Sequence, residues 1–178
     1  NGTMPFSILA RYAFIGTSFF NSLVTNKVIS TKAKTGFLSS IDTIATQLYE
    51  SSMKIYDSKQ NLELFIENFG HLRPNTYDIE TPNYKENFSA YFPKKIKKEY
   101  NKKTNSFSFS IDEFKQIDKR LGEYCFNSKE LIDFIKESIK AREYSKYMFT
   151  KTLSLILDLV KQYGIILESQ DHKCHILI

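Results

Sequence analysis

The chain has few of the residues that phosphate-binding loops, disulfide frameworks and metal sites require. Its 178 residues include six glycines, four prolines, two cysteines, three histidines and no tryptophan. The glycines stand far apart, at positions 2, 16, 36, 70, 122 and 164. Nucleotide-binding loops need clustered glycines so that the backbone can approach a phosphate closely. The dispersed glycines therefore exclude a P-loop or a dinucleotide-binding turn.

The two cysteines, Cys125 and Cys174, lie far apart and form no disulfide or metal-knuckle pattern. This is consistent with a reducing cytosol. His172 and His175 flank Cys174 in "DHKCH" (residues 171–175). Paired ligands of a structural metal usually have about two to four residues between them, so this crowded segment does not favour a metal site. We expect no metal ligand in the chain.

An apolar stretch near the start of the chain does not have the features of a membrane or export segment. Residues 1–24 are interrupted by Arg11 and follow no basic leader. We therefore expect neither a signal peptide nor a membrane span, and a cytoplasmic protein. The sequence begins Asn-Gly-Thr without an initiator Met, which predicts a piece of a longer polypeptide.

The net charge of +5 is concentrated in one segment. "KKIKKEYNKK", from Lys94 to Lys103, holds six lysines and one glutamate, and the rest of the chain balances at 19 basic and 19 acidic residues. Such a patch can attract phosphate groups. A solvated, lysine-rich linker or surface face explains it equally well and is the commoner case. Nucleic-acid binding is therefore not the preferred interpretation.

The hydrophobic pattern predicts an all-α fold. Apolar residues recur at three- and four-residue steps in five segments, which are residues 3–24, 37–56, 58–69, 110–121 and 128–164. Ser58 and the capping box "SIDE" (residues 110–113) mark helix starts, and Gly70 stands where a cap glycine belongs. The alternation in "SFSFSI" (residues 106–111) is too short to build a sheet. We expect residues 1–178 to form one irregular helical domain, with one long C-terminal helix and a polar loop after the third helix.

Within that loop, "GHLRPNTYDIETP" places histidine, arginine, tyrosine and aspartate side chains close together at the end of a helix. Arg73 offers a planar donor fork for a carboxylate or phosphate, and Asp78 can accept from an amide or ammonium group. Loops held by rigid helices are common places for a binding site. The alternative is a structured turn, in which Asp78 caps the backbone, Arg73 pairs with it and His71 packs. The residues by themselves leave both interpretations open.

Two further polar positions interrupt apolar helices. Arg11 lies between Ala10 and Tyr12 in the first segment, and "AREYSK" (residues 141–146) places Arg142 in the long one. Either arginine is more often part of a solvated face, but either could line a pocket with the loop.

Three motifs resemble one family of enzymes. "GHLRPNTYDIETPNYKEN" (residues 70–87) is similar to the "GHRGPGE…D…SPRW" element of the phosphoenolpyruvate synthase/pyruvate phosphate dikinase-like phosphotransferases, the rifampin phosphotransferase superfamily. It looks closer to the "GHLRPGTYDI" form of the bacterial glutamine kinase-like branch, which is associated with capsule phosphoramidate synthesis. Residues 2–24 resemble the first helix of that branch, and "AREYSKYMFTKTLS" (residues 141–154) resembles its long-helix motif.

The resemblance implies the function of one part of a larger kinase. In these proteins an ATP-grasp domain phosphorylates a histidine on a swivelling domain, which carries the phosphoryl group to an acceptor on a helical middle domain. This chain lacks both partner domains, so it resembles the acceptor-binding domain alone and is not expected to be active by itself. No cofactor is expected in the fragment, whereas the full-length enzyme would use ATP and Mg²⁺. The implied partners are the other two domains and a small polar acceptor such as L-glutamine.

The resemblance also assigns roles to residues of the loop. Arg73 would hold a carboxylate or the incoming phosphoryl group, whereas His71 and Asp78 would orient the accepting atom or take its proton. The remaining substrate-binding candidates are Arg11, Tyr77 and Arg142. Asn75 stands where the branch usually has glycine. The glutamate of the rifampin-type element is not matched, since Tyr77 lies near its place, which argues against a rifampin-like acceptor.

Two other functions remain open at this point. The chain could be a helical module that binds RNA or another anion through residues 94–103, or a scaffold whose polar loop docks neighbouring domains. An anion-binding module predicts affinity that falls steeply with salt. An acceptor-binding domain predicts ligand effects that depend on Arg73 and His71.

Overall fold

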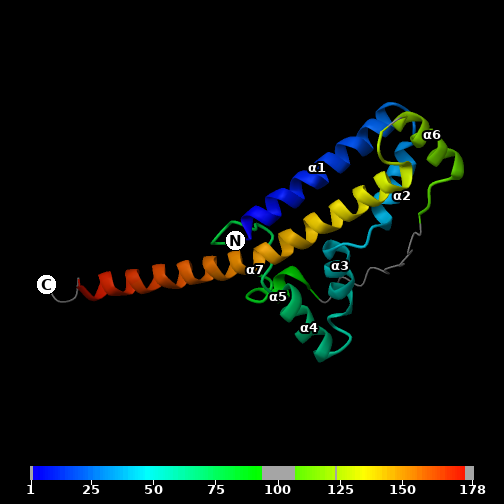
Figure 1. Ribbon diagram of the computed structural model, residues 1–178. Coiled ribbons are helices and arrows are strands. Elements are labelled where there is room, and N and C mark those ends of the chain that lie inside the picture. The colour runs from blue at the N-terminus through cyan, green and yellow to red at the C-terminus, as the bar shows by residue number, and fades with distance from the viewer. Residues whose placement is uncertain (1, 94–106, 123, 175–178) are drawn as a thin grey trace. The chain divides into compact units, whose positions relative to one another are not determined.

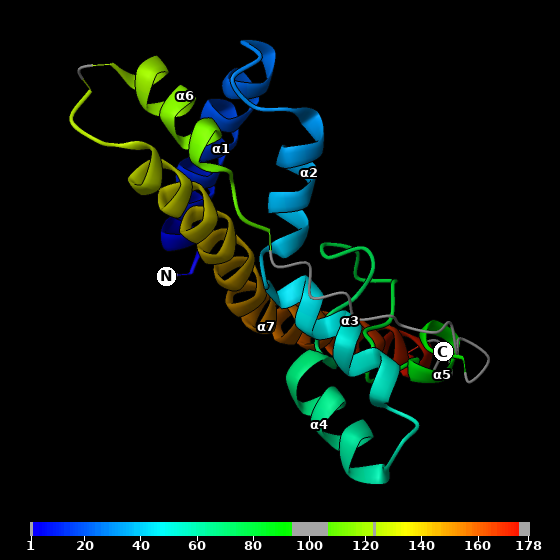
Figure 2. The same ribbon diagram turned by 90° about the vertical axis from the view of Figure 1, so that its right-hand side faces the viewer.

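The computed structural model describes residues 2–93, 107–122 and 124–174, with side chains through residue 168. Its elements are α1 (Thr3–Thr25), α2 (Thr31–Ser40), α3 (Ile44–Lys54), α4 (Lys59–Phe69), α5 (Phe88–Tyr91), α6 (Ile111–Leu121) and α7 (Ser128–Cys174). Figures 1 and 2 show these helices from two directions, and no strand occurs in the described part of the chain. The expected all-α class is therefore confirmed, as is the long C-terminal helix, which has 47 residues.

The chain divides into two compact units. One unit comprises residues 1–47 and 99–147, and the other comprises residues 48–98 and 148–178. Each unit has its own buried residues and receives one part of α7.

The first unit is held together by an apolar core. Its buried members come from α1, α2, α6, the start of α7 and the loops beside them, and are Phe20, Leu23, Ile29, Ala33, Phe37, Ile41, Phe109, Ile117, Leu121, Leu131, Ile132 and Ile135. Phe20 meets Phe37 edge to face, with the ring centroids 5.2 Å apart. In the second unit Phe65 is buried, and its ring contacts those of Phe88 and Phe92, with centroid distances of 5.8 and 4.9 Å.

The buried face of α1 contains some of its large apolar residues but not all of them. Tyr12, Ile15 and Phe19 are 43–48% exposed, whereas the buried residues of the helix are Ala13, Gly16, Phe20 and Leu23. The physical reason is close helix packing. A Cβ on Gly16 would lie 3.0 Å from Ser138 Oγ and 3.4 Å from Ile135 Cα, so small residues let α1 approach α7. Figure 1 shows these two helices running side by side.

The single helix expected over residues 37–56 is wrong. The structure has two helices there, α2 and α3, and α2 begins earlier, where the Ser30 hydroxyl accepts a hydrogen bond from Ala33 N. At the break, Ile41 N donates to the Leu38 carbonyl at 3.3 Å, and Ser40 Oγ donates to the Phe37 carbonyl. Ile41 takes an extended conformation at the break and is buried in the core.

Local signals predict the other helix ends well. Ser58 caps α4, and Ser110 and Glu113 form both hydrogen bonds of the expected capping box at α6. Gly122 ends α6 with φ +61° and ψ −120°, a conformation that favours glycine. The one-turn helix α5 lies in a stretch that the sequence pattern leaves without helix. Because residues 37–56 form two helices, the polar loop follows α4, which is the third helix expected from the sequence.

Candidate functional site

The polar loop, residues 70–87, is closed by two backbone hydrogen bonds near its ends. Lys85 N donates to the Gly70 carbonyl at 3.0 Å, and Tyr84 N donates to the Leu72 carbonyl at 2.8 Å. The loop begins where α4 ends, since Gly70 N still donates to the Ile66 carbonyl. A Cβ on Gly70 would lie 2.3 Å from that same carbonyl oxygen, so glycine suits this position. The loop is therefore an ordered structure with defined ends.

Arg73 is the centre of the loop's hydrogen-bond network. Its side chain is only 3% exposed. One terminal nitrogen, Nη1, donates to the carbonyls of Asp78 and Thr81 at 3.3 and 3.2 Å. The other, Nη2, donates to Ser154 Oγ at 2.9 Å and to Asp158 Oδ1 at 2.8 Å. Its Nε atom is buried and has no hydrogen-bond partner among the described residues. Arg73 thus holds the loop in shape and attaches it to α7.

The residues that α7 contributes to this network were not predicted from the sequence. Ser154 is buried and Asp158 keeps 30% of its side chain in solvent. Asn83 is buried on the loop side, and its Nδ2 lies 3.5 Å from Asp158 Oδ2. One signal was available, because Ser154 and Asp158 are polar residues four apart in a leucine-rich segment, and residues four apart share a helix face.

Asp78 stabilises the loop through its own neighbours. Its carboxylate accepts from Thr81 Oγ1 at 2.7 Å and from Glu80 N at 2.9 Å. These two hydrogen bonds, the one from Thr81 first, hold the pKa of the Asp78 carboxyl below its ordinary value of 3.8. The structured-turn interpretation is confirmed for Asp78. Arg73, by contrast, contacts the Asp78 carbonyl and pairs with the carboxylate of Asp158.

The lowered pKa makes part of the loop's stability depend on pH. Ionised Asp78 is favoured in the folded chain, so its contribution is complete above the unfolded pKa and is lost as the pH falls through the lower folded pKa. We expect Asp78→Ala to lower the melting temperature at neutral pH, and this difference to shrink as the pH falls below about 4. Thermal unfolding followed by circular dichroism at several pH values measures it. Asp57→Ala, at an exposed carboxylate of the same unit, serves as the control, and an Asp78 effect that stays constant with pH would contradict the assignment.

The other loop candidates differ in accessibility. His71 is partly buried, directly after the end of α4, whereas Tyr77, near the middle of the loop, is 66% exposed. Tyr84 lies against Tyr91 and Phe92, with ring centroids 5.3 and 5.1 Å away. Burial raises the pKa of the Tyr84 phenol, and Tyr91 adds to this rise. Among the candidate site residues, Tyr77 and the open part of Asp158 are accessible, and Asn75 and Glu80 of the loop are exposed as well.

Arg11 and Arg142 belong to the first unit, whereas the polar loop belongs to the second. Arg11 is exposed on α1. Arg142 is partly buried, and its guanidinium carbon lies over the Phe14 ring, 5.3 Å from the centroid. This contact supplies a cation–π attraction between α1 and α7. The expected convergence of these two arginines with Arg73 stays a prediction.

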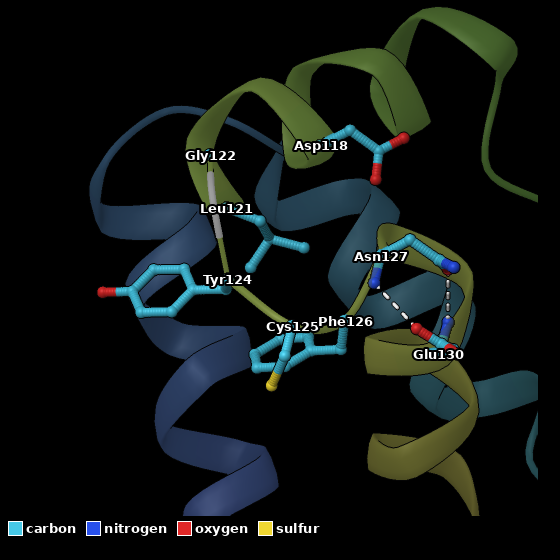
Figure 3. Close-up of a pocket in the computed structure, with 8 residues that line it drawn as sticks. All are labelled: Asp118, Leu121, Gly122, Tyr124, Cys125, Phe126, Asn127 and Glu130. Atoms are coloured by element: carbon cyan, nitrogen blue, oxygen red, sulfur yellow. Dashed lines mark hydrogen bonds between the residues drawn. The ribbon is translucent and has the colours of Figure 1, made fainter.

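The first unit also contains a pocket of about 490 Å³ at the connection between α6 and α7, shown in Figure 3. The carboxylates of its two acidic residues accept hydrogen bonds from backbone amides at the start of α7. Asp118 Oδ1 accepts from Ser128 N at 2.7 Å, and Glu130 Oε2 accepts from Asn127 N at 2.9 Å. The pocket also exposes the Cys125 thiol. These contacts indicate a helix cap, and none of the residues expected from the sequence lines it.

Two segments singled out in the sequence lie outside what the structure describes. Residues 94–103 fall in the gap between residues 93 and 107, and the side chains of residues 171–175 are not described. Among the described residues, no group of three His, Cys, Asp or Glu side chains could hold a metal ion. Within the same residues, no helix combines the length and apolarity needed to cross a membrane.

Comparison with known proteins gives no neighbour for this arrangement: no family model, no curated protein and no solved structure matches the chain.

Proposed function

We propose that the chain is the acceptor-binding helical domain of a cytoplasmic, ATP-dependent phosphotransferase of the phosphoenolpyruvate synthase-like kind. A phosphohistidine on a separate domain would deliver the phosphoryl group, and that domain, ATP and Mg²⁺ would belong to the rest of the polypeptide. The acceptor would be small and polar, with L-glutamine as the specific candidate. This proposal comes from the resemblance of residues 70–87 to the family element, and the geometry of the loop supports it.

The observation that carries the proposal is the partly buried ion pair between Arg73 and Asp158, with 2.8 Å between Nη2 and Oδ1. A residue of the family-like element is thereby joined to α7 across 85 positions of sequence. Binding sites work best when each ligand-contacting group is held by neighbours that fix its orientation. Arg73 meets this need for Asp158, because it holds Oδ1, whereas Oδ2 lies 3.5 Å from Asn83 Nδ2 and 30% of the side chain is exposed.

This geometry shifts the expected roles within the site. The terminal nitrogens of Arg73 are all engaged inside the protein, so we assign Arg73 to positioning the loop. We assign the direct contact with the acceptor to Asp158, since a partly exposed carboxylate can accept from the ammonium or amide N–H of an amino acid. Tyr77 and His71 remain the loop residues proposed to surround the acceptor. Asp78 orders the part of the loop that follows Tyr77 through its bonds to Thr81 and Glu80.

Calorimetric titration with L-glutamine tests the proposal. We expect saturable binding to the unaltered chain, and at least tenfold weaker binding to Asp158→Asn, which keeps an oxygen acceptor for Arg73 but loses the charge. Asp57→Asn, an exposed acid in the same unit, should bind like the unaltered chain.

A parallel titration with a short RNA distinguishes the acceptor-binding proposal from the main alternative, an anion-binding module. No heat with L-glutamine, together with RNA binding that weakens steeply as salt rises, would contradict the acceptor-binding proposal. It would instead favour an anion-binding module that uses residues 94–103.

A further inference from the structure

One face of α7 in the second unit is apolar and exposed. Six of its large side chains are 44–62% accessible to solvent, and they are Leu155, Ile156, Leu159, Val160, Tyr163 and Leu167. We call these six residues the apolar stripe. At about 100° per residue they fall within one sector of the helix, roughly 140° wide, that contains no charged residue between positions 155 and 168. The opposite face carries Ser154 and Asp158, which bind Arg73.

We propose that the apolar stripe is the interface through which two copies of this chain associate. The spacing supports helix-to-helix packing, because positions 152, 156, 159 and 163 follow one another at steps of four, three and four residues. This is the a/d spacing by which two helices pack along a common seam. Thr152, Ile156, Leu159 and Tyr163 occupy these four positions.

A second copy is the partner that the chemistry of the stripe fits best. The stripe has no charge, so pairing it with itself brings no like charges together and buries no unpaired ion. A two-fold dimer needs such a self-complementary surface, since the same patch is used on both subunits. Another partner with charge complementarity would need a charged rim beside the stripe. Among the described side chains of α7 in the second unit, the nearest exposed charge, Lys151, lies about 40° beyond one edge of the sector.

The area of the stripe is also sufficient. Half-exposed side chains of this size each keep on the order of 100 Å² in solvent, so six of them offer about 600 Å², comparable with the roughly 800 Å² that each partner buries in a stable complex. Exposed apolar patches of this extent mark interaction sites in soluble proteins.

Sedimentation equilibrium of the whole chain over a range of concentrations tests the proposal. The chain has a mass of 20.8 kDa, and we expect its average mass to rise to that of a dimer with concentration. Leu159→Glu should raise the dissociation constant at least tenfold. Ile165→Glu is the matched control, because Ile165 is 59% exposed on the same helix but lies about 120° around it from Leu159.

Circular dichroism of both variants should show unchanged helix content, so that loss of association is not loss of folding. A chain that stays monomeric at every concentration would overturn the proposal, and so would equal dissociation in the two glutamate variants. The test does not involve L-glutamine, so its result is independent of the proposed function.

Discussion

Replacing Arg73 with alanine should destabilise the second unit by about 3 kcal/mol. The substitution removes donors from two carbonyls and from Ser154, and it leaves Asp158 without its cation. Loss of one partner of a fully buried pair costs about 3–5 kcal/mol, and the 30% exposure of Asp158 places this case near the lower end. Urea unfolding followed by circular dichroism measures the change in free energy.

Two companion variants separate the charge of Arg73 from its shape. Arg73→Lys should lose about 1–2 kcal/mol, because a single ammonium cannot reach all four acceptors that the guanidinium fork reaches. Lys59→Ala, at an ion pair whose side chains are 89% and 65% exposed, should change stability by less than about 0.5 kcal/mol. An Arg73→Ala variant as stable as Lys59→Ala would show that the network does not hold the loop.

Replacing Phe20 with alanine should have a comparable effect on the first unit, a loss of about 3–5 kcal/mol. Phe20 is 1% exposed, and its ring contacts Phe37 and Phe109 with centroids 5.2 and 6.4 Å apart. Removing it leaves a cavity between α1 and α2 that rigid neighbours cannot fill. The same urea experiment measures it.

Phe14→Ala is the matched control on the same helix. Phe14 is 60% exposed and contacts Arg142, so its loss should cost less than about 1 kcal/mol. Equal losses for the two phenylalanines would mean that the buried face of α1 is assigned wrongly.

Helix existence and helix starts were predictable because they depend on neighbouring residues. The Ser110–Glu113 capping box and the Ser58 cap involve groups three residues apart, so the sequence displays them directly. The break at Ile41 was missed because the periodic apolar pattern continues across it. Burial of Ile41 in the core, which supports the break, depends on residues distant in sequence.

Large apolar residues identify only part of the buried face of α1, namely Phe20 and Leu23. The close contact with α7 uses Ala13 and Gly16, whose small size is what lets the helices approach. Hydrophobicity alone does not register such a face.

The polar loop was predicted as the candidate site, but its partner on α7 was not. His71, Arg73, Tyr77 and Asp78 are adjacent in the chain, so their clustering is visible in the sequence. Asp158 is 85 positions from Arg73, and only the folded second unit brings the two together. The pairing changes the proposed role of Arg73 from ligand contact to positioning.

The most direct test of the acceptor-binding proposal is an NMR titration of the ¹⁵N-labelled chain with L-glutamine. The proposal predicts that the largest amide shifts fall in residues 70–87 and around Ser154 and Asp158, and that they saturate with ligand. An absence of shifts, or shifts confined to residues of the first unit, would contradict it.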